Sequence, residues 1–117
     1  WWLLNRGPLI AGTLWTEEMM IPQEDGTLKT DGYFLGGHAY LINEWREDGY
    51  IGIQNSWGPQ WGDNGKAYIK AEDFLELFIY SGEILAAVEL ADRQEESQSL
   101  CEELWCKILR FFRDLFT

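Results

Sequence analysis

The chain has 117 residues, of which 46% are hydrophobic and 25% charged, and this balance suits one soluble globular domain and excludes a disordered chain. The net charge of -11 is opposite to the basic footprint of a nucleic-acid-binding protein, and it disfavours binding to acidic membrane surfaces. No apolar run reaches transmembrane length and no signal-peptide pattern is visible, so the compartment is not identified, and the cytoplasm is favoured.

The first 35 residues predict a single strand between two loops. Gly7 and Pro8 form a turn signal, and Leu9–Trp15 has the length and apolar content of a strand. Residues 23–26 mark a second turn, in a loop that runs to about Tyr33.

The middle of the chain predicts a β-hairpin followed by a tightly turning loop. Ala39–Trp45 and Tyr50–Asn55 are strand-like runs on either side of a short polar segment that ends in Gly49. Glycines, a proline, Asp and Asn then crowd residues 58–65, which indicates an irregular loop. A short strand over 67–70, a helical turn over 73–78 and a final strand over 83–90 complete the expected elements.

The tail predicts a separate helix. Leu100, Leu104, Ile108, Phe111 and Leu115 recur at three- and four-residue steps, which is helical spacing. We therefore expect a half-domain over 1–90, a charged linker over 91–98 and an amphipathic helix over 99–117. The apolar stripe of this helix could pack on its own domain or pair with a second copy of the chain.

Two residues of the hairpin form a candidate chemical pair, His38 and Asn55. In one register they lie directly opposite each other; in the register shifted by two residues His38 faces Trp57, and Asn55 is its diagonal neighbour. Both registers put the two side chains on one face of the sheet, whereas a slip of one residue would separate them. A carboxamide beside an imidazole can accept a hydrogen bond from one ring nitrogen and thereby aim the other at a nucleophile.

These residues belong to a longer pattern that resembles the C-terminal half of papain-like cysteine peptidases. Gly37-His38-Ala39 is followed by Asn55-Ser56-Trp57-Gly58 and then by Trp61-Gly62-Asp63-Asn64-Gly65. Upstream, Gly7-Pro8-Leu9-Ile10 is similar to a strand entry of that family, and Lys66–Lys70 is similar to the strand that follows its glycine loop. The resemblance covers roughly residues 4–90, and as a compound motif it is specific.

The resemblance implies a role for each matching residue. His38 would be the catalytic base that pairs with a cysteine, and Asn55 would orient it. Trp57 would shield the His–Asn hydrogen bond from water, and Trp61 would line the leaving-group side of the substrate cleft. The loop glycines would allow the segment that carries both tryptophans to fold back tightly.

The chain also departs from that family. The nucleophile of the family lies at the start of a helix in a Gly-x-Cys-Trp-like context, in an N-terminal half that also supplies a Gln, whereas no cysteine precedes Cys101 here. Gly37 stands where Asp or Asn often precedes the His. Glu102 and Glu103 would oppose a thiolate at Cys101, so we interpret Cys101 as a core or interface thiol. Its spacing of five residues from Cys106 on one predicted helix disfavours an internal disulfide.

We therefore expect a mainly β fold: a partial antiparallel β-barrel resembling the C-terminal half of the papain fold, plus the C-terminal helix. The expected function is peptide-bond hydrolysis at a Cys-His-Asn site whose cysteine comes from a missing helical half or another chain, so the isolated chain should be inactive. The alternative is a non-catalytic binding or assembly module. The expected partner is a peptide or protein substrate. No metal-ligand cluster or phosphate-binding loop is present in the sequence, so no cofactor is expected.

Overall fold

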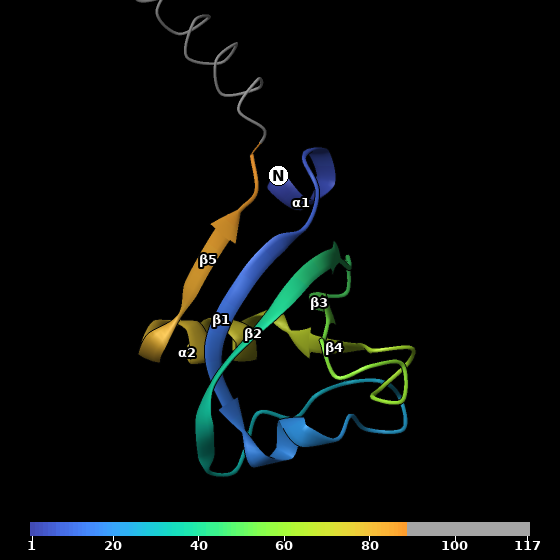
Figure 1. Cartoon of the computed structure of the whole chain (residues 1–117), viewed down its shortest axis with the longest axis vertical. Coiled ribbons are helices and arrows are strands. Elements are labelled where there is room, and N and C mark those ends of the chain that lie inside the picture. The colour runs from blue at the N-terminus through green and yellow to red at the C-terminus, as the bar shows by residue number, and fades with distance from the viewer. Residues whose placement is uncertain (89–117) are drawn as a thin grey trace, which may run out of the picture. The chain divides into compact units, whose positions relative to one another are not determined.

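A computed structural model describes residues 1–88 of the chain (Figure 1). Residues Trp1–Ala86 form one compact unit. The elements in chain order are α1 (Trp2–Asn5), β1 (Leu9–Thr16), the 3-10 helix η1 (Glu17–Met20), β2 (Phe34–Trp45), β3 (Tyr50–Gln54), β4 (Lys66–Lys70), α2 (Ala71–Ser81) and β5 (Glu83–Ala86). The predicted linker over 91–98 and helix over 99–117 lie outside the described residues.

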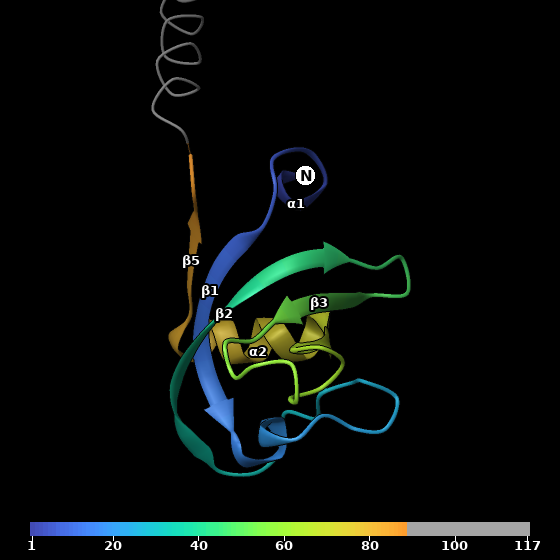
Figure 2. The ribbon, with the colours of Figure 1, turned by 45° about the vertical axis from the view of Figure 1, so that its right-hand side comes forward.

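The five strands form one antiparallel sheet in the order β4-β3-β2-β1-β5 (Figures 1 and 2). The expectation of a mainly β, antiparallel fold is confirmed. The sheet is open, because β4 and β5 stand at its two ends and are joined by α2 instead of pairing with each other. Within residues 1–88 the strands therefore form no closed barrel.

The pairing of β2 with β3 changes register along its length. Near the turn, Glu44 pairs with Gly52. Farther from the turn, Ile42 pairs with Ile53 and Leu41 with Gln54. One extra residue on β2, Asn43, makes this change, which is the arrangement of a β-bulge. The bulge decides which side chains share a face at the far end of the hairpin, because a shift of one residue moves a side chain to the opposite face.

The core lies on one face of the sheet and is closed by α2. On β1 the buried side chains alternate at Ala11, Thr13 and Trp15, the spacing of a half-buried strand. Phe74 and Leu77 of α2 pack into the same cluster as Ile53 and Ile69, which are fully buried. The remaining members of the cluster are Met19, Leu28, Tyr40, Ile42, Ile51, Trp61 and Ala67.

Three elements differ clearly in length from their prediction. Strand β2, expected over 39–45, begins already at Phe34. The helical turn expected over 73–78 is an 11-residue helix, because Phe74, Leu77 and the half-buried Phe78 repeat at helical spacing against the core. Strand β5 ends at Ala86, earlier than the predicted residue 90. In the described part of the chain, no helix has both the length and the apolar character needed to cross a membrane.

Candidate active site

His38 and Asn55 come together at the far end of the hairpin. His38 lies on β2, directly opposite Thr13 of β1, and Asn55 is the first residue after β3. If the pairing of Leu41 with Gln54 is continued along the strands, His38 faces Trp57 and Asn55 is its diagonal neighbour. This is the second of the two registers expected from the sequence. The Nε2 atom of His38 lies 2.8 Å from the Oδ1 atom of Asn55, so the structure brings the predicted pair into hydrogen-bond contact.

The hydrogen bonds around Asn55 define the protonation of the imidazole. The backbone N–H of Ser56 donates to Oδ1 of Asn55 at 2.8 Å, which fixes the orientation of the amide because Nδ2 could not accept that bond. Oδ1 can then only accept from His38, so Nε2 carries the proton. In the neutral ring Nδ1 is left as the basic nitrogen, which is the arrangement that general-base chemistry requires.

Aromatic rings surround the imidazole. The Trp57 ring centroid lies 4.8 Å from that of His38, and Trp57 is 40% exposed, so it contacts the imidazole from a partly exposed position. Its predicted shielding role stays a prediction. Trp15 lies 4.6 Å from His38 in an edge-to-face contact and is 3% exposed, so it supports the ring from the core.

Trp61 ties the glycine loop to the segment after β1. Its Nε1 atom donates to the backbone oxygen of Met20 at 2.8 Å, and its ring lies 5.9 Å from that of Trp57. Trp61 is buried, so its contacts are those of a loop anchor. The predicted place of Trp61 along a substrate cleft stays a prediction.

The loop from Asn55 to Gly65 closes on itself through backbone contacts. The N–H of Asn55 donates to the oxygen of Gly65 at 2.8 Å. Gly62 and Gly65 have φ angles of 58° and 83°, the left-handed region that favours glycine. A Cβ atom at Gly62 would lie 2.2 Å from the oxygen of Lys66, so this position also lacks the space for any other residue.

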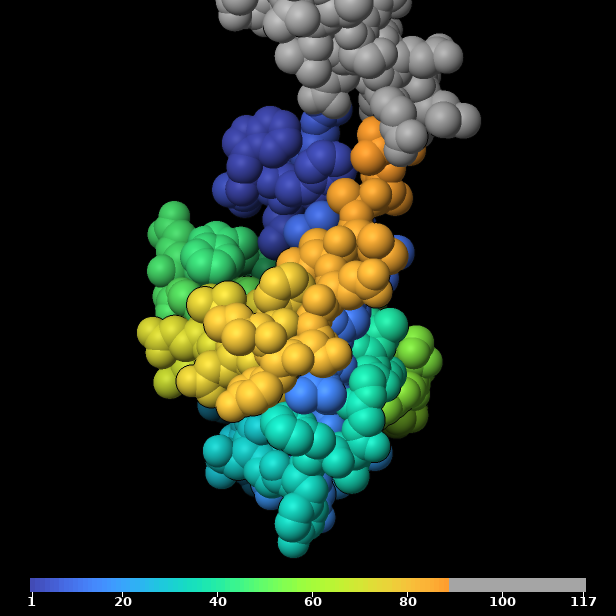
Figure 3. Space-filling view, turned by 90° about the vertical axis from the view of Figure 1, so that its left-hand side faces the viewer, coloured from blue at the N-terminus to red at the C-terminus, as the bar shows by residue number. Residues whose placement is uncertain are grey.

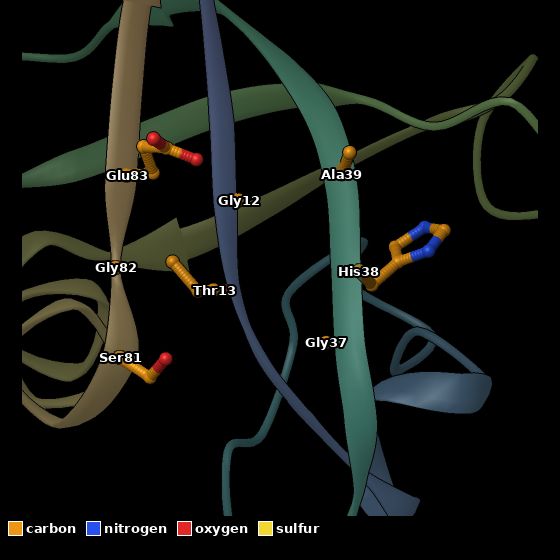
Figure 4. A pocket seen from close by; sticks show the side chains of 8 residues that line it. All are labelled: Gly12, Thr13, Gly37, His38, Ala39, Ser81, Gly82 and Glu83. Carbon is orange, nitrogen blue, oxygen red and sulfur yellow. The ribbon is translucent and has the colours of Figure 1, made fainter.

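A shallow hollow of about 530 Å³ lies on the other side of β2 (Figure 4). Gly12 and Gly37 form part of its floor, and a Cβ atom at either position would meet no other atom within 4 Å. The imidazole of His38 points away from Ser81 and Glu83 in Figure 4, so the hollow and the basic nitrogen lie on different sides of the strand. Glu83 is the carboxylate among the lining residues.

Tyr40 lies beneath the site and is buried. Burial raises the pKa of the Tyr40 phenol to about 12, and the hydrogen bond with Thr13, at 2.9 Å, partly opposes that change. Among residues 1–88 there is no group of three or more His, Cys, Asp or Glu side chains that could hold a metal ion.

Sequence reasoning missed Trp15. A tryptophan in a strand predicts burial, but nothing in the sequence indicates which residue of another strand it contacts. That contact depends on the pairing of β1 with β2, whose strands are separated by residues 17–33. In the structure Ala11, Thr13 and Trp15 alternate with exposed or half-buried neighbours, whereas the residues of this strand show no matching alternation of apolar and polar types in the sequence.

No protein-family model matches the chain. The chain is similar to a Giardia intestinalis protein named Cathepsin B-like CP2, with 36% identity over 67 residues. The match covers 54% of this chain and 22% of that protein, so the chain spans about a fifth of the length of the curated relative it matches. The similarity supports a relationship to papain-like cysteine peptidases over part of the chain.

Proposed function

We propose that residues 1–90 are the histidine- and asparagine-bearing half of a papain-like cysteine peptidase, with a fold like the C-terminal half of such enzymes. The observation that carries this proposal is the hydrogen bond from Nε2 of His38 to Oδ1 of Asn55, which leaves Nδ1 free as a base. The partial similarity to a cathepsin B-like protein supports the same reading.

In the proposed reaction, Nδ1 of His38 takes the proton of a cysteine thiol. The thiolate attacks the carbonyl carbon of a peptide bond, and the C–N bond then breaks as His38 returns the proton to the leaving amine. Water attacks the resulting thioester while His38 accepts one of its protons. The C–S bond breaks, releasing a carboxylic acid, and the proton returns to the sulfur. Asn55 holds the ring through these steps, and Trp57 limits the access of water to the hydrogen bond.

The cysteine must come from another segment or another chain, and the outer face of the sheet offers a surface for that partner. Ile10 pairs with Leu41 on one side and with Leu85 on the other, and these three side chains are 43%, 37% and 55% exposed. An exposed apolar row on the face opposite the core needs a cover. In Figure 3, β1 is visible between β5 and β2 on this side of the molecule. We propose that the partner that supplies the cysteine covers this row with one part of its chain, while its thiol approaches Nδ1 of His38 from the opposite side of β2, to which the imidazole points.

Reconstitution tests the proposal. The helical, Gly-x-Cys-Trp-bearing half of a papain-like peptidase is fused ahead of Trp1 or added as a separate chain, and hydrolysis of a fluorogenic peptide is measured. We expect His38→Ala to lower the activity about 10²- to 10⁴-fold, the usual contribution of a general acid–base. Asn55→Ala should lower it by a smaller factor. Cys101→Ala and Cys106→Ala are the matched controls and should leave it unchanged. Turnover by the isolated 117-residue chain that survives both cysteine substitutions would contradict the mechanism.

A second measurement does not depend on a heterologous half. In the isolated chain, NMR of the single histidine should show the proton on Nε2 in the neutral ring, and Asn55→Ala should raise the population of the Nδ1–H form. A wild-type ring protonated on Nδ1 would contradict the proposed base.

The alternative is a non-catalytic binding or assembly module. Such a module would keep the His–Asn pair and the tryptophan cluster for structural reasons. The full-length coding sequence separates the two proposals. An upstream Gln and Gly-x-Cys-Trp would support the peptidase, whereas a start codon next to Trp1 would support the module.

A further inference from the structure

Trp15 makes more ring contacts around the site than any tryptophan singled out in the sequence. Its centroid lies 4.6 Å from His38, 5.6 Å from Tyr40, 5.7 Å from Trp57 and 6.3 Å from Trp61. We infer that Trp15 is a positioning residue, which holds the imidazole of His38 at the angle at which Nε2 reaches Asn55. That this orientation serves catalysis rests on the proposed function, whereas the contact by which Trp15 orients the ring does not.

One hydrogen bond does not fix the orientation of an imidazole. The bond to Asn55 restrains Nε2, but the terminal torsion of a histidine side chain is broad and roughly two-fold, so the ring plane needs a second restraint. Trp57 and Trp15 both contact the ring. Trp57 is 40% exposed on a loop, whereas Trp15 is 3% exposed on the strand that pairs with the strand of His38. Trp15 is therefore the rigid support of the two.

The strand pairing explains how the indole reaches His38. Trp15 stands directly opposite Gly36, and Thr13 stands opposite His38, so Trp15 and His38 are diagonal neighbours on the core face. Gly36 has no side chain that could stand between the two rings. A large residue at either Thr13 or Gly36 would compete for the same space.

The indole nitrogen argues against a purely space-filling role. Nε1 of Trp15 is buried without a hydrogen-bond partner in the described residues, as is Nδ2 of Asn55. Burying an unpaired N–H destabilises the fold, and a leucine would fill core space without that cost. Core packing alone therefore does not require a ring at this position, whereas the edge-to-face contact with His38 does.

The test uses NMR of the full chain, in which His38 is the one histidine and gives one set of ring signals. Long-range proton–nitrogen spectra of the neutral ring report which nitrogen carries the proton. We expect Trp15→Leu to raise the population of rings without the Nε2–H form about two- to tenfold, the ratio that one aromatic pair supports. Trp15→Phe should retain the wild-type form. Phe74→Leu removes another buried aromatic, on α2, and is the matched control that should leave the His38 signals unchanged.

Two results would overturn the inference: His38 signals that are the same in Trp15→Leu as in Trp15→Phe, or an equal change in Phe74→Leu. If Trp15→Leu does not fold, Trp15→Met provides the comparison, since its flexible side chain fills more of the space without a ring. A wild-type ring protonated on Nδ1 would refute the proposed function. A wild-type Nε2–H form that is insensitive to Trp15 would refute only the positioning role.

Discussion

Replacing Gly62 by alanine should unfold the site loop selectively, and Gly49 offers a matched control. Both glycines have positive φ angles, 58° at Gly62 and 85° at Gly49. An alanine in the left-handed region costs about 1–2 kcal/mol, and the lower entropy of the unfolded chain offsets about 0.4–1 kcal/mol of that. At Gly49 nothing else opposes the substitution, since a Cβ atom there meets no other atom within 4 Å. We therefore expect Gly49→Ala to destabilise the protein by about 1 kcal/mol.

At Gly62 a steric clash adds to the loss of stability caused by the backbone conformation. The new Cβ atom would lie 2.2 Å from the oxygen of Lys66, and that oxygen accepts the hydrogen bond from the N–H of Asp63 at 2.9 Å. The Lys66 oxygen is a backbone atom and the position of Cβ is fixed by the backbone of residue 62, so no side-chain rotation relieves the clash. Forcing atoms into a packed region costs about 1–3 kcal/mol, which brings the expected destabilisation by Gly62→Ala to about 2–4 kcal/mol.

Urea unfolding monitored by tryptophan fluorescence measures both variants under the same conditions. The free energy of unfolding should fall further for Gly62→Ala, and the NMR signals of His38 should shift in that variant only, because Gly62 adjoins the anchor Trp61. Equal losses of stability within about 0.5 kcal/mol would show that the clash is relieved by a backbone movement, and the reasoning would be refuted.

Three further outcomes are expected. Because burial raises the pKa of Tyr40 to about 12, above its value in the unfolded chain, its contribution to stability is fully present below pH 10 and is lost as the pH rises through 12. That loss amounts to about 3 kcal/mol and should be absent in Tyr40→Phe; urea titrations at pH 9 and above check it. Trp61→Phe removes the hydrogen bond to Met20 and should lower the unfolding free energy by about 1 kcal/mol, measured by thermal denaturation. Leu85→Lys should weaken binding of the helical half in the reconstitution experiment. Since Leu85 is exposed, the free energy of unfolding of the isolated chain should stay within about 0.5 kcal/mol of the wild-type value. If the variant binds the helical half as well as the wild type does, the partner lies elsewhere.

The local parts of the site could be predicted because they depend on short-range rules. The hairpin and the position of His38 relative to Asn55 follow from strand length, a short turn and the two-residue period of side chains. The bulge at Asn43 was not predictable, because nothing in the sequence distinguishes it from a regular strand residue. Without it, the register at Glu44 and Gly52 would have continued and put His38 on the face opposite Asn55.

The remaining features depend on contacts between distant segments. The loop after β1 pairs with β4, where Thr27 bridges Tyr68 and the N–H of Leu28 donates to the oxygen of Tyr68. This pairing helps to bury Leu28 and could not be deduced from a segment that is rich in turn residues. Sequence patterns also do not predict sheet closure, which depends on whether β4 and β5, the strands at the two ends of the sheet, pair with each other.

The extra residue at Asn43 has a consequence for how this hairpin tolerates change. Since it absorbs the mismatch between the turn and the His–Asn end, removing it would join Ile42 directly to Glu44 with both sets of partners intact. A variant without Asn43 would therefore keep both the turn and the His38–Asn55 end in their present pairings, joined by a regular ladder.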